Sequence, residues 1–233
     1  MIREIVDLLY PRRCPLCDGI VDWGGLICPV CEKKLTYIEE PFCRRCGKPL
    51  ETEEEYCFDC AKREHEYREG TALFVHQGAV RNSLYRFKYE NKREYALFYA
   101  TQTARFRGEW IRRRRVEAIV PVPLHKNRKK ERGYNQAELY ARHLGRSLGI
   151  PVIRNWLVRR ADTRPQKELD RTQRKNNMKR AFKCKKNIVQ FKYILLVDDI
   201  YTTGSTVDAA AKALKQAGAQ DVFFVCVSIG MGF

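Results

Sequence analysis

Residues 194–206 read Ile-Leu-Leu-Val-Asp-Asp-Ile-Tyr-Thr-Thr-Gly-Ser-Thr, and this stretch constrains the fold more than any other. The four apolar residues Ile194–Val197 are long enough for a buried strand and too short for a helix, so we expect the strand to end at Asp198. Small hydroxyl residues and a glycine follow, and the alanine-rich stretch from Val207 predicts a helix. Amide groups at the start of a helix lack partners and attract anions. The sequence therefore predicts a phosphate-binding loop between a central strand and a helix.

Two acids, Asp198 and Asp199, stand directly before this loop, where they would repel a bound phosphate. Ribose hydroxyls next to a 5′-phosphate, or a divalent cation, would remove that conflict. The stretch resembles the 5-phosphoribosyl-1-pyrophosphate (PRPP) motif of type I phosphoribosyltransferases, in which four apolar residues, two acids and a Thr-Thr-Gly loop stand in this order. The resemblance implies that PRPP is bound by Asp198, Asp199, Tyr201, Thr202, Thr203, Gly204, Ser205 and Thr206. An ordinary capped loop with solvated acids is the alternative.

Eight of the ten cysteines form four Cys-x-x-Cys pairs, separated by 10, 11 and 10 residues. Tetrahedral zinc needs four thiolates at about 2.3 Å, and each pair presents two of them from one tight turn. We therefore expect two structural zinc ions. Sequential ligation assigns Cys14, Cys17, Cys28 and Cys31 to one ion and Cys43, Cys46, Cys57 and Cys60 to the other. A cross-brace between the first and third pairs is the alternative, but repeated short loops lose less entropy on closing.

The chain is strongly basic, because 45 lysines and arginines against 28 acids give a net charge of +17. Residues 112–186 carry 24 basic and 6 acidic side chains, so this region accounts for the whole excess. Such a concentration favours a polyanionic partner, and a solvated basic surface is the simpler explanation. Arg44, Arg45 and Lys48 bring positive charge to the second cysteine cluster, but the glutamates within 51–55 oppose a phosphate contact there.

The cellular location follows from the absence of targeting signals in the sequence. Residues 2–9 predict a short amphipathic helix with acids in it and no small-residue cleavage site, so they do not form a signal peptide. The longest apolar tract, near 222–233, is too short to cross a bilayer. Paired cysteines in a reducing compartment more often hold metal than form disulfides. We therefore expect no transmembrane segment and a cytoplasmic protein, either free or peripheral at the inner face of the membrane.

The chain divides into an N-terminal helix with a double zinc ribbon at 1–66 and a larger domain at 67–233. In the larger domain, expected strands alternate with helices, which indicates an α/β fold with a mainly parallel sheet and helices on both faces. This is the type I phosphoribosyltransferase-like architecture. The expected strands are 71–75, 117–123, 150–153, 194–198 and 221–227. The expected helices are 79–89, 93–112, 135–148 and 207–214.

A basic loop at 124–136 follows the strand 117–123 and should reach the same edge of the sheet as the acids. PRPP enzymes bind pyrophosphate at such a second loop, and Lys126, Arg128 and Arg132 are the candidate ligands here. A basic loop without a ligand is the alternative. His125 is more plausible as a loop residue than as an acid or base, because no carboxylate partner is identifiable. The polar stretch 160–177 is typical of a lid or binding loop.

The chain is identified as a member of the ComF/GntX family of competence-associated, phosphoribosyltransferase-like proteins, which it resembles over nearly its whole length. Besides the cysteine pairs and 197–206, the resemblance rests on Phe87-Lys88-Tyr89, Val120-Pro121-Val122-Pro123-Leu124, Arg132-Gly133-Tyr134-Asn135-Gln136, Thr163, Gln166, Leu169, Arg174 and Asn177. It implies a PRPP-binding fold, fused to zinc ribbons, that brings incoming single-stranded DNA into the cytoplasm during natural transformation. It also implies competence proteins such as a helicase-like translocase as partners. The expected DNA contacts are Lys129, Lys130, Tyr134 and Arg174.

Three functions follow from these features. The first is the handling of single-stranded DNA in DNA uptake by a protein whose pocket binds PRPP. The second is a magnesium-dependent phosphoribosyltransferase, in which the catalytic acids Asp198 and Asp199 hold the ribose and, through it, the metal, and the acceptor is an unidentified base or amine. The third is a PRPP-responsive regulator that reads duplex DNA, and it ranks last because no helix-turn-helix is visible in the sequence.

Overall fold

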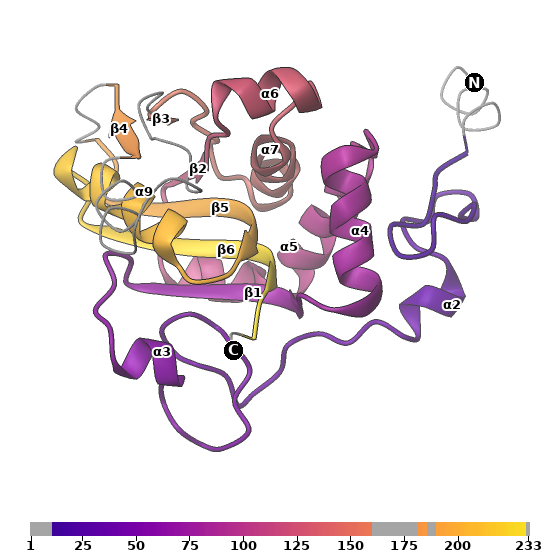
Figure 1. The fold of residues 1–233 in the computed structure, drawn as a ribbon, viewed down its shortest axis with the longest axis horizontal. Helices are drawn as coiled ribbons and strands as arrows, with labels where there is room; N and C mark the ends of the chain where they lie inside the picture. The colour runs from indigo at the N-terminus through magenta and orange to yellow at the C-terminus, as the bar shows by residue number, and fades with distance from the viewer. Residues whose placement is uncertain (1–10, 160–180, 186–189, 232–233) are drawn as a thin grey trace, which may run out of the picture.

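The computed structural model describes residues 11–159, 181–185 and 190–231 (Figure 1). The expected helix at 2–9, the polar stretch 160–177 and Arg174 therefore lie outside the described residues.

The centre of the larger domain is a four-stranded parallel sheet, as the sequence predicts. Its strands are β1 (Glu69–Val75), β2 (Ala118–Pro121), β5 (Tyr193–Tyr201) and β6 (Asp221–Ile229). They lie in the order β1-β6-β5-β2, and every pair of neighbours runs parallel. Strands β5 and β6 are long apolar runs with buried residues on both sides, which places them in the middle of the sheet.

Helices cover both faces of this sheet (Figure 1). On one face, α4 (Gly78–Tyr89), α5 (Tyr95–Arg113) and α7 (Gln136–Leu148) pack against Leu195 and Val197 of β5. The other face carries α9 (Ser205–Gln216), whose small alanines let the helix approach the sheet closely. The expected α/β architecture is therefore confirmed, and the expected bounds of α4, α5 and α7 differ from the observed ones by at most two residues.

A short antiparallel pair, β3 (Leu157–Arg159) and β4 (Phe182–Cys184), lies beside α9 and was not expected from the sequence. Three-residue strands leave too little periodicity to be recognised. The strand expected at 150–153 is reduced to a single bridge between Ile119 and Val152.

Strand β5 does not end at Asp198, so that expectation is wrong. It continues through both acids to Tyr201, because Asp198, Ile200 and Tyr201 pair with residues of β6. The partner strand supplies backbone hydrogen bonds whether or not the side chains are apolar. The helix after the loop accordingly begins at Ser205.

The basic segment after β2 is a helix, α6 (Lys126–Arg132), and not a loop. His125 caps its first turn by accepting a hydrogen bond from the amide of Asn127 at 3.3 Å. Gly133 ends the helix in the left-handed conformation at φ 75°. None of the α6 side chains is buried, so the sequence lacked the apolar spacing by which helices are recognised. His125 is thus a capping residue.

The two cysteine-rich ribbons dock on different parts of the domain. The first contains α2 (Pro29–Glu32) and contacts α4, where Arg86 donates hydrogen bonds to the carbonyl groups of Pro15 and Leu16. The second contains α3 (Phe58–Ala61), and its buried cysteines belong to the core under α9. Figure 1 shows α2 beside α4 and α3 below β1. Across the described residues, no helix has the length and apolarity needed to span a membrane.

Candidate functional site

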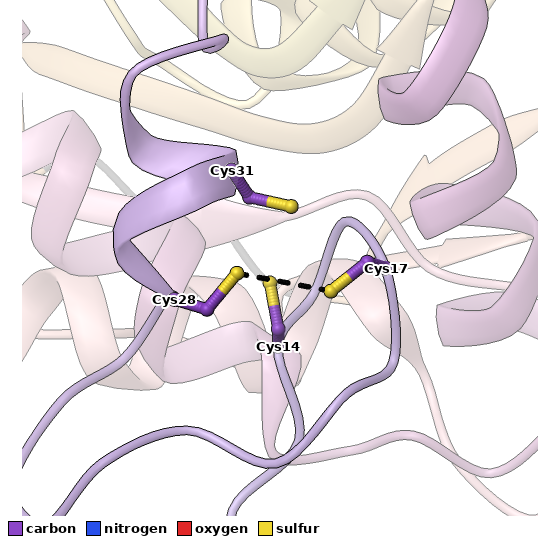
Figure 2. Close-up of side chains that lie close together, drawn as sticks. All are labelled: Cys14, Cys17, Cys28 and Cys31. Carbon is purple, nitrogen blue, oxygen red and sulfur yellow. Dashed lines mark hydrogen bonds between the residues drawn. The ribbon is translucent and has the colours of Figure 1, made fainter.

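Each cysteine cluster has the geometry of a tetrahedral metal site. Within each group, the four sulfur atoms all lie within 4.8 Å of one another. Figure 2 shows the first group, which consists of Cys14, Cys17, Cys28 and Cys31. The sulfur atoms of Cys17 and Cys28 are 3.8 Å apart, and those of Cys46 and Cys57 are 3.7 Å apart. Zinc–sulfur bonds of about 2.3 Å would give such spacings in a tetrahedron. The residues fit two structural zinc ions with sequential ligation, and the cross-brace is excluded.

The second group consists of Cys43, Cys46, Cys57 and Cys60, and it is tied to the rest of the site. Sγ of Cys60 lies 3.5 Å from Nε2 of His65. On its other side, Nδ1 of His65 is hydrogen-bonded to the carboxylate of Asp208 at 3.0 Å, in the first turn of α9. A ring nitrogen near a zinc thiolate with a carboxylate behind it is a typical outer-shell arrangement. The cluster is therefore linked directly to the helix that begins at the phosphate loop.

Asp208 is the point at which the second ribbon holds α9. Its carboxylate also accepts hydrogen bonds from Arg63 at 2.8 Å and from the amide of Glu66 at 3.0 Å. Arg63 reaches further and donates to the carbonyl oxygen of Thr203, inside the loop, at 3.3 Å. The segment that leaves the second ribbon thus forms the back of the loop between β5 and α9.

The loop itself is built for close approach of an anion. Thr202 and Thr203 are exposed, and the hydroxyl groups of Thr203 and Ser205 lie 3.0 Å apart. Gly204 precedes α9 with φ 75°, and a β-carbon there would collide with the hydroxyl group of Tyr201. Only glycine fits this position without strain. The free amides at the start of α9 therefore open onto a surface of hydroxyl groups.

Tyr201 does not offer its side chain to a ligand. It is 4% exposed, its ring stacks on Phe224 at 4.8 Å, and its hydroxyl group is hydrogen-bonded to that of Tyr67 at 2.7 Å. The motif alone predicts Tyr201 among the PRPP-binding residues. In the structure it supports the loop from below.

The two acids that precede the loop have different partners. Side chains alternate along a strand, so Asp198 and Asp199 point to opposite faces of β5. Oδ1 of Asp199 lies 2.9 Å from Nζ of Lys88 in the last turn of α4, and both side chains are largely buried. Asp198 instead accepts a hydrogen bond from the amide of Asp199 at 2.8 Å. Asp199 is therefore neutralised within the protein, whereas Asp198 has no such ion pair among the described residues.

Burial raises the pKa of Asp198 to about 7, and the charge of the neighbouring Asp199 adds to the effect. The positive charges of Lys88 and Arg159 act in the opposite direction. A carboxyl group with this pKa changes its charge near neutral pH, so its affinity for a cation or a hydroxyl group is set by its surroundings.

Arg159, at the end of β3, is a site residue that the sequence did not reveal. Burial lowers the pKa of Arg159, and the positive charge of Arg128 in α6 lowers it further. The charge of Arg159 in turn lowers the pKa of Asp198. Its Nε is buried without a hydrogen-bond partner among the described residues, and its guanidinium lies over the ring of Phe182 at 5.5 Å. The charges of Lys88 and Arg159 therefore act on Asp198 from α4 and β3, and Arg128 of α6 acts on Arg159.

The other expected cations are arranged less uniformly. Lys126, Arg128, Lys129 and Lys130 are exposed on α6. Arg132 turns the other way, donates hydrogen bonds to the hydroxyl of Tyr89 at 3.0 Å and to Gln136 at 3.2 Å, and lies over the Tyr89 ring. It is thus engaged in packing α6 onto α4 and α7.

Tyr134 cannot stack with a nucleic-acid base, so its assignment as a DNA contact is wrong. It is 6% exposed, its hydroxyl group donates to the carbonyl oxygen of Phe87, and Arg93 covers its ring at 4.7 Å. The aromatic ring fills the space between α4 and the start of α7.

Lys88 and Arg159 were not among the expected site residues. The sequence held a signal for the first of them and none for the second. Lys88 stands in the Phe87-Lys88-Tyr89 motif, and its place in the last turn of a predicted helix beside the sheet edge was a usable signal. Arg159 belongs to the unexpected β3–β4 pair, so nothing in the local pattern placed it near the acids.

Comparison with known proteins agrees with both parts of this architecture. A double zinc ribbon domain matches residues 5–61, and a phosphoribosyl transferase domain matches residues 130–230. Competence protein F of Haemophilus influenzae is 32% identical over 90% of this chain and 93% of its own length. Competence protein ComFC of Bacillus subtilis is 30% identical over 94% of this chain and 95% of its own length. DNA utilization protein YhgH of Escherichia coli is 28% identical over 94% of this chain and 98% of its own length. The chain therefore belongs to the family of competence protein F, ComFC and YhgH, in which an N-terminal double zinc ribbon precedes a phosphoribosyltransferase domain.

Proposed function

We propose that this chain is a cytoplasmic PRPP-binding protein that handles incoming single-stranded DNA during natural transformation. The observation that carries the PRPP part is the loop 202–206 at the carboxyl end of the central strand, where hydroxyl groups and free helix amides adjoin an acid with a pKa near neutrality. Relatives named for competence and DNA utilization, together with a net charge of +17, support the DNA part.

In this proposal each part of PRPP has its own contacts. The 5′-phosphate binds the loop 202–206 and the first amides of α9. Asp198 accepts from the ribose hydroxyls and shares a magnesium ion with them, while Asp199 is held by Lys88 and orients its neighbour. Arg128 and Arg159 provide the positive charge for pyrophosphate.

Titration calorimetry with PRPP and magnesium tests the pocket. We expect one binding site per chain in the parent protein, and its loss when both acids are removed in the variant Asp198→Ala/Asp199→Ala. A Glu138→Ala variant, which removes a partly exposed acid of α7 that pairs with Arg154, serves as the control and should bind like the parent. Equal affinity of the double variant and the parent would refute the assignment of the pocket.

The DNA part is tested separately by binding to labelled oligonucleotides at several salt concentrations. Contacts to phosphates release counterions, so we expect affinity for single strands of any sequence to fall steeply as salt rises. A protein that prefers one duplex sequence would instead be a regulator. No binding at low salt would argue against DNA handling and would leave the PRPP result unaffected.

Phosphoribosyl transfer is a second candidate, favoured by the charge of Arg159 that acts on Asp198 and by that of Arg128 that acts on Arg159. Cations at this position would stabilise the negative charge that develops on departing pyrophosphate. Incubation with PRPP, magnesium and a panel of bases and amines should then release pyrophosphate. If no acceptor releases it above the rate without protein, binding without turnover is the better description.

A further inference from the structure

A second recess lies at the opposite end of the sheet from the PRPP pocket. It is a cleft of about 810 Å³ between the second zinc ribbon, the last two turns of α5 and the beginning of β1 at Glu69. The volume is within the roughly 300–1,000 Å³ of typical ligand pockets. The PRPP loop follows the carboxyl end of β5, whereas the cleft adjoins the amino end of β1, and β5 and β1 both run parallel to β6.

The cleft carries more positive than negative charge. Its arginines are Arg44, Arg45, Arg68, Arg107, Arg113 and Arg114, and they face four glutamates. Glu69 pairs with Arg114, and Glu109 pairs with Arg113 at the surface. Arg44 pairs with Glu55 at 2.6 Å and Arg68 with Asp221 at 2.8 Å, two acids outside the cleft lining. Arg45 has no carboxylate within 4 Å in the described part of the chain, and its guanidinium lies 6.0 Å from the ring of Tyr56. The Arg113–Glu109 and Arg44–Glu55 pairs are exposed and contribute little, so a phosphate can compete for these two arginines.

Aromatic rings lie among these arginines and are held in place from behind. Tyr56 and Phe106 are each 38% exposed. Phe106 borders the cleft, stacks on Tyr37 with 3.9 Å between ring centres, and carries the guanidinium of Arg105 over its ring at 5.1 Å. Trp110 is covered by the guanidinium of Arg114 at 3.7 Å. Fixed rings beside guanidinium groups are the arrangement by which proteins stack unpaired bases while they neutralise the backbone.

We propose that this cleft binds a segment of single-stranded nucleic acid, with Tyr56 stacking on a base and Arg45 contacting phosphate. The inference rests on the proposed DNA handling and assigns a place to it. Duplex DNA hides its base faces and cannot use the rings. An acidic polypeptide would not need the rings either.

The test measures fluorescence anisotropy of a labelled 12-nucleotide oligo-dT with the full-length, zinc-loaded protein at low salt. Tyr56→Ala should weaken binding by about fivefold or more, since one base–aromatic stack is worth that much. Phe58→Ala is the matched control, because Phe58 flanks the same cysteine, is 71% exposed and does not line the cleft. Arg45→Ser should reduce the salt dependence by about one phosphate contact, whereas Arg146→Ser on α7 should change it less. Saturating PRPP should leave the affinity of the parent protein for oligo-dT unchanged.

Some results would overturn the cleft while leaving the proposed DNA handling intact. The first such result is that the parent binds oligo-dT and that both Tyr56→Ala and Arg45→Ser bind it with the same affinity. The second is that poly-glutamate competes with oligo-dT for the protein. The third is that a duplex binds more tightly than the single strand. Absence of oligo-dT binding by the parent would overturn both. Should a variant lose its two zinc ions, photocrosslinking of the parent to an iodouracil-containing strand decides instead: crosslinks at 56, 106 or 110 support the cleft, and crosslinks confined to other peptides refute it.

Discussion

At the scale of single residues, two adjacent acids do different work. Asp199 is neutralised by Lys88 inside the protein, and this ion pair leaves one formal negative charge for the ligand side. Asp198 keeps that role, but burial and its neighbour hold its pKa at about 7. The protein therefore maintains an acid whose ionised form is unfavourable until a cation or a sugar hydroxyl arrives. Such a group stabilises ligand binding at the expense of the unliganded fold.

The substitution Asp198→Asn should therefore stabilise the free protein. The pKa of Asp198 is raised in the folded state, so ionisation of Asp198 destabilises the fold progressively as pH rises from the ordinary pKa of 3.8 to about 7. Above that pH the destabilisation stays constant. The gain in the free energy of unfolding should grow by up to roughly 1.4 kcal/mol per pH unit across this window. Urea unfolding of parent and variant between pH 5 and 8 measures it.

The control is Asp199→Asn, which leaves Lys88 buried without its partner and should destabilise the protein at neutral pH. A difference between Asp198→Asn and the parent that does not change with pH would contradict the raised pKa.

At the scale of secondary-structure elements, the PRPP loop is held by a segment that is distant in sequence. Residues 63–67 leave the second ribbon and contact α9 through Asp208 and the loop through Thr203. The side chains of Tyr67 and Tyr201 join underneath it. The start of α9 is thus fixed from outside its own helix, which limits the entropy lost when a phosphate binds.

We expect Asp208→Ala to weaken PRPP binding although Asp208 does not face the ligand. The change leaves Arg63, His65 and the amide of Glu66 without their acceptor, at a cost of about 1–3 kcal/mol for each buried group. Calorimetric affinity for PRPP and thermal unfolding should both report it. The loss of affinity should be smaller in Asp208→Asn, which keeps one acceptor oxygen. Unchanged affinity in Asp208→Ala would show that the loop is rigid by itself.

How well the sequence predicted these elements depended on how much apolar surface each one buries. Strands β5 and β6 and helices α4, α5 and α7 were predictable because their apolar residues recur at the right spacing. Helix α6 buries nothing, and β3 and β4 have three residues each, so these elements were missed. The acids, the loop and the cysteines were visible as motifs. Arg159 and the network around Asp208 were not, because they depend on tertiary contacts between distant segments.

At the scale of the whole molecule, the zinc ribbons are part of the folded body. Cys43, Cys46 and Cys57 are buried in the same core as Ala209 and Leu214 of α9. Elemental analysis of the purified protein should find two zinc ions per chain, and fewer than one would contradict the ligand assignment. Because structural zinc contributes folding energy, chelation should also lower the unfolding temperature.

The two metal sites should differ in their effect on PRPP. Cys57→Ser, in the second ribbon, should weaken PRPP binding, since the tail of that ribbon forms the back of the loop. Cys14→Ser, in the first ribbon, should leave the affinity for PRPP near the parent value. That ribbon contacts α4 and α5 through Arg86 and Tyr95 rather than the loop. Zinc content and PRPP affinity measured on both variants make the comparison. Equal losses of affinity would mean that zinc acts only through global stability.

The docking of the two ribbons on different parts of the domain has a consequence for the kind of DNA they can meet. Tandem zinc fingers read a duplex because successive modules follow one groove, each shifted along it from the last. Here α2 lies beside α4 and α3 lies below β1, so the two ribbons contact different parts of the domain (Figure 1). The pair therefore cannot track a single groove as neighbouring fingers do. A repressor or activator built on tandem modules is incompatible with this placement, whereas a strand that threads past one face of the protein is not.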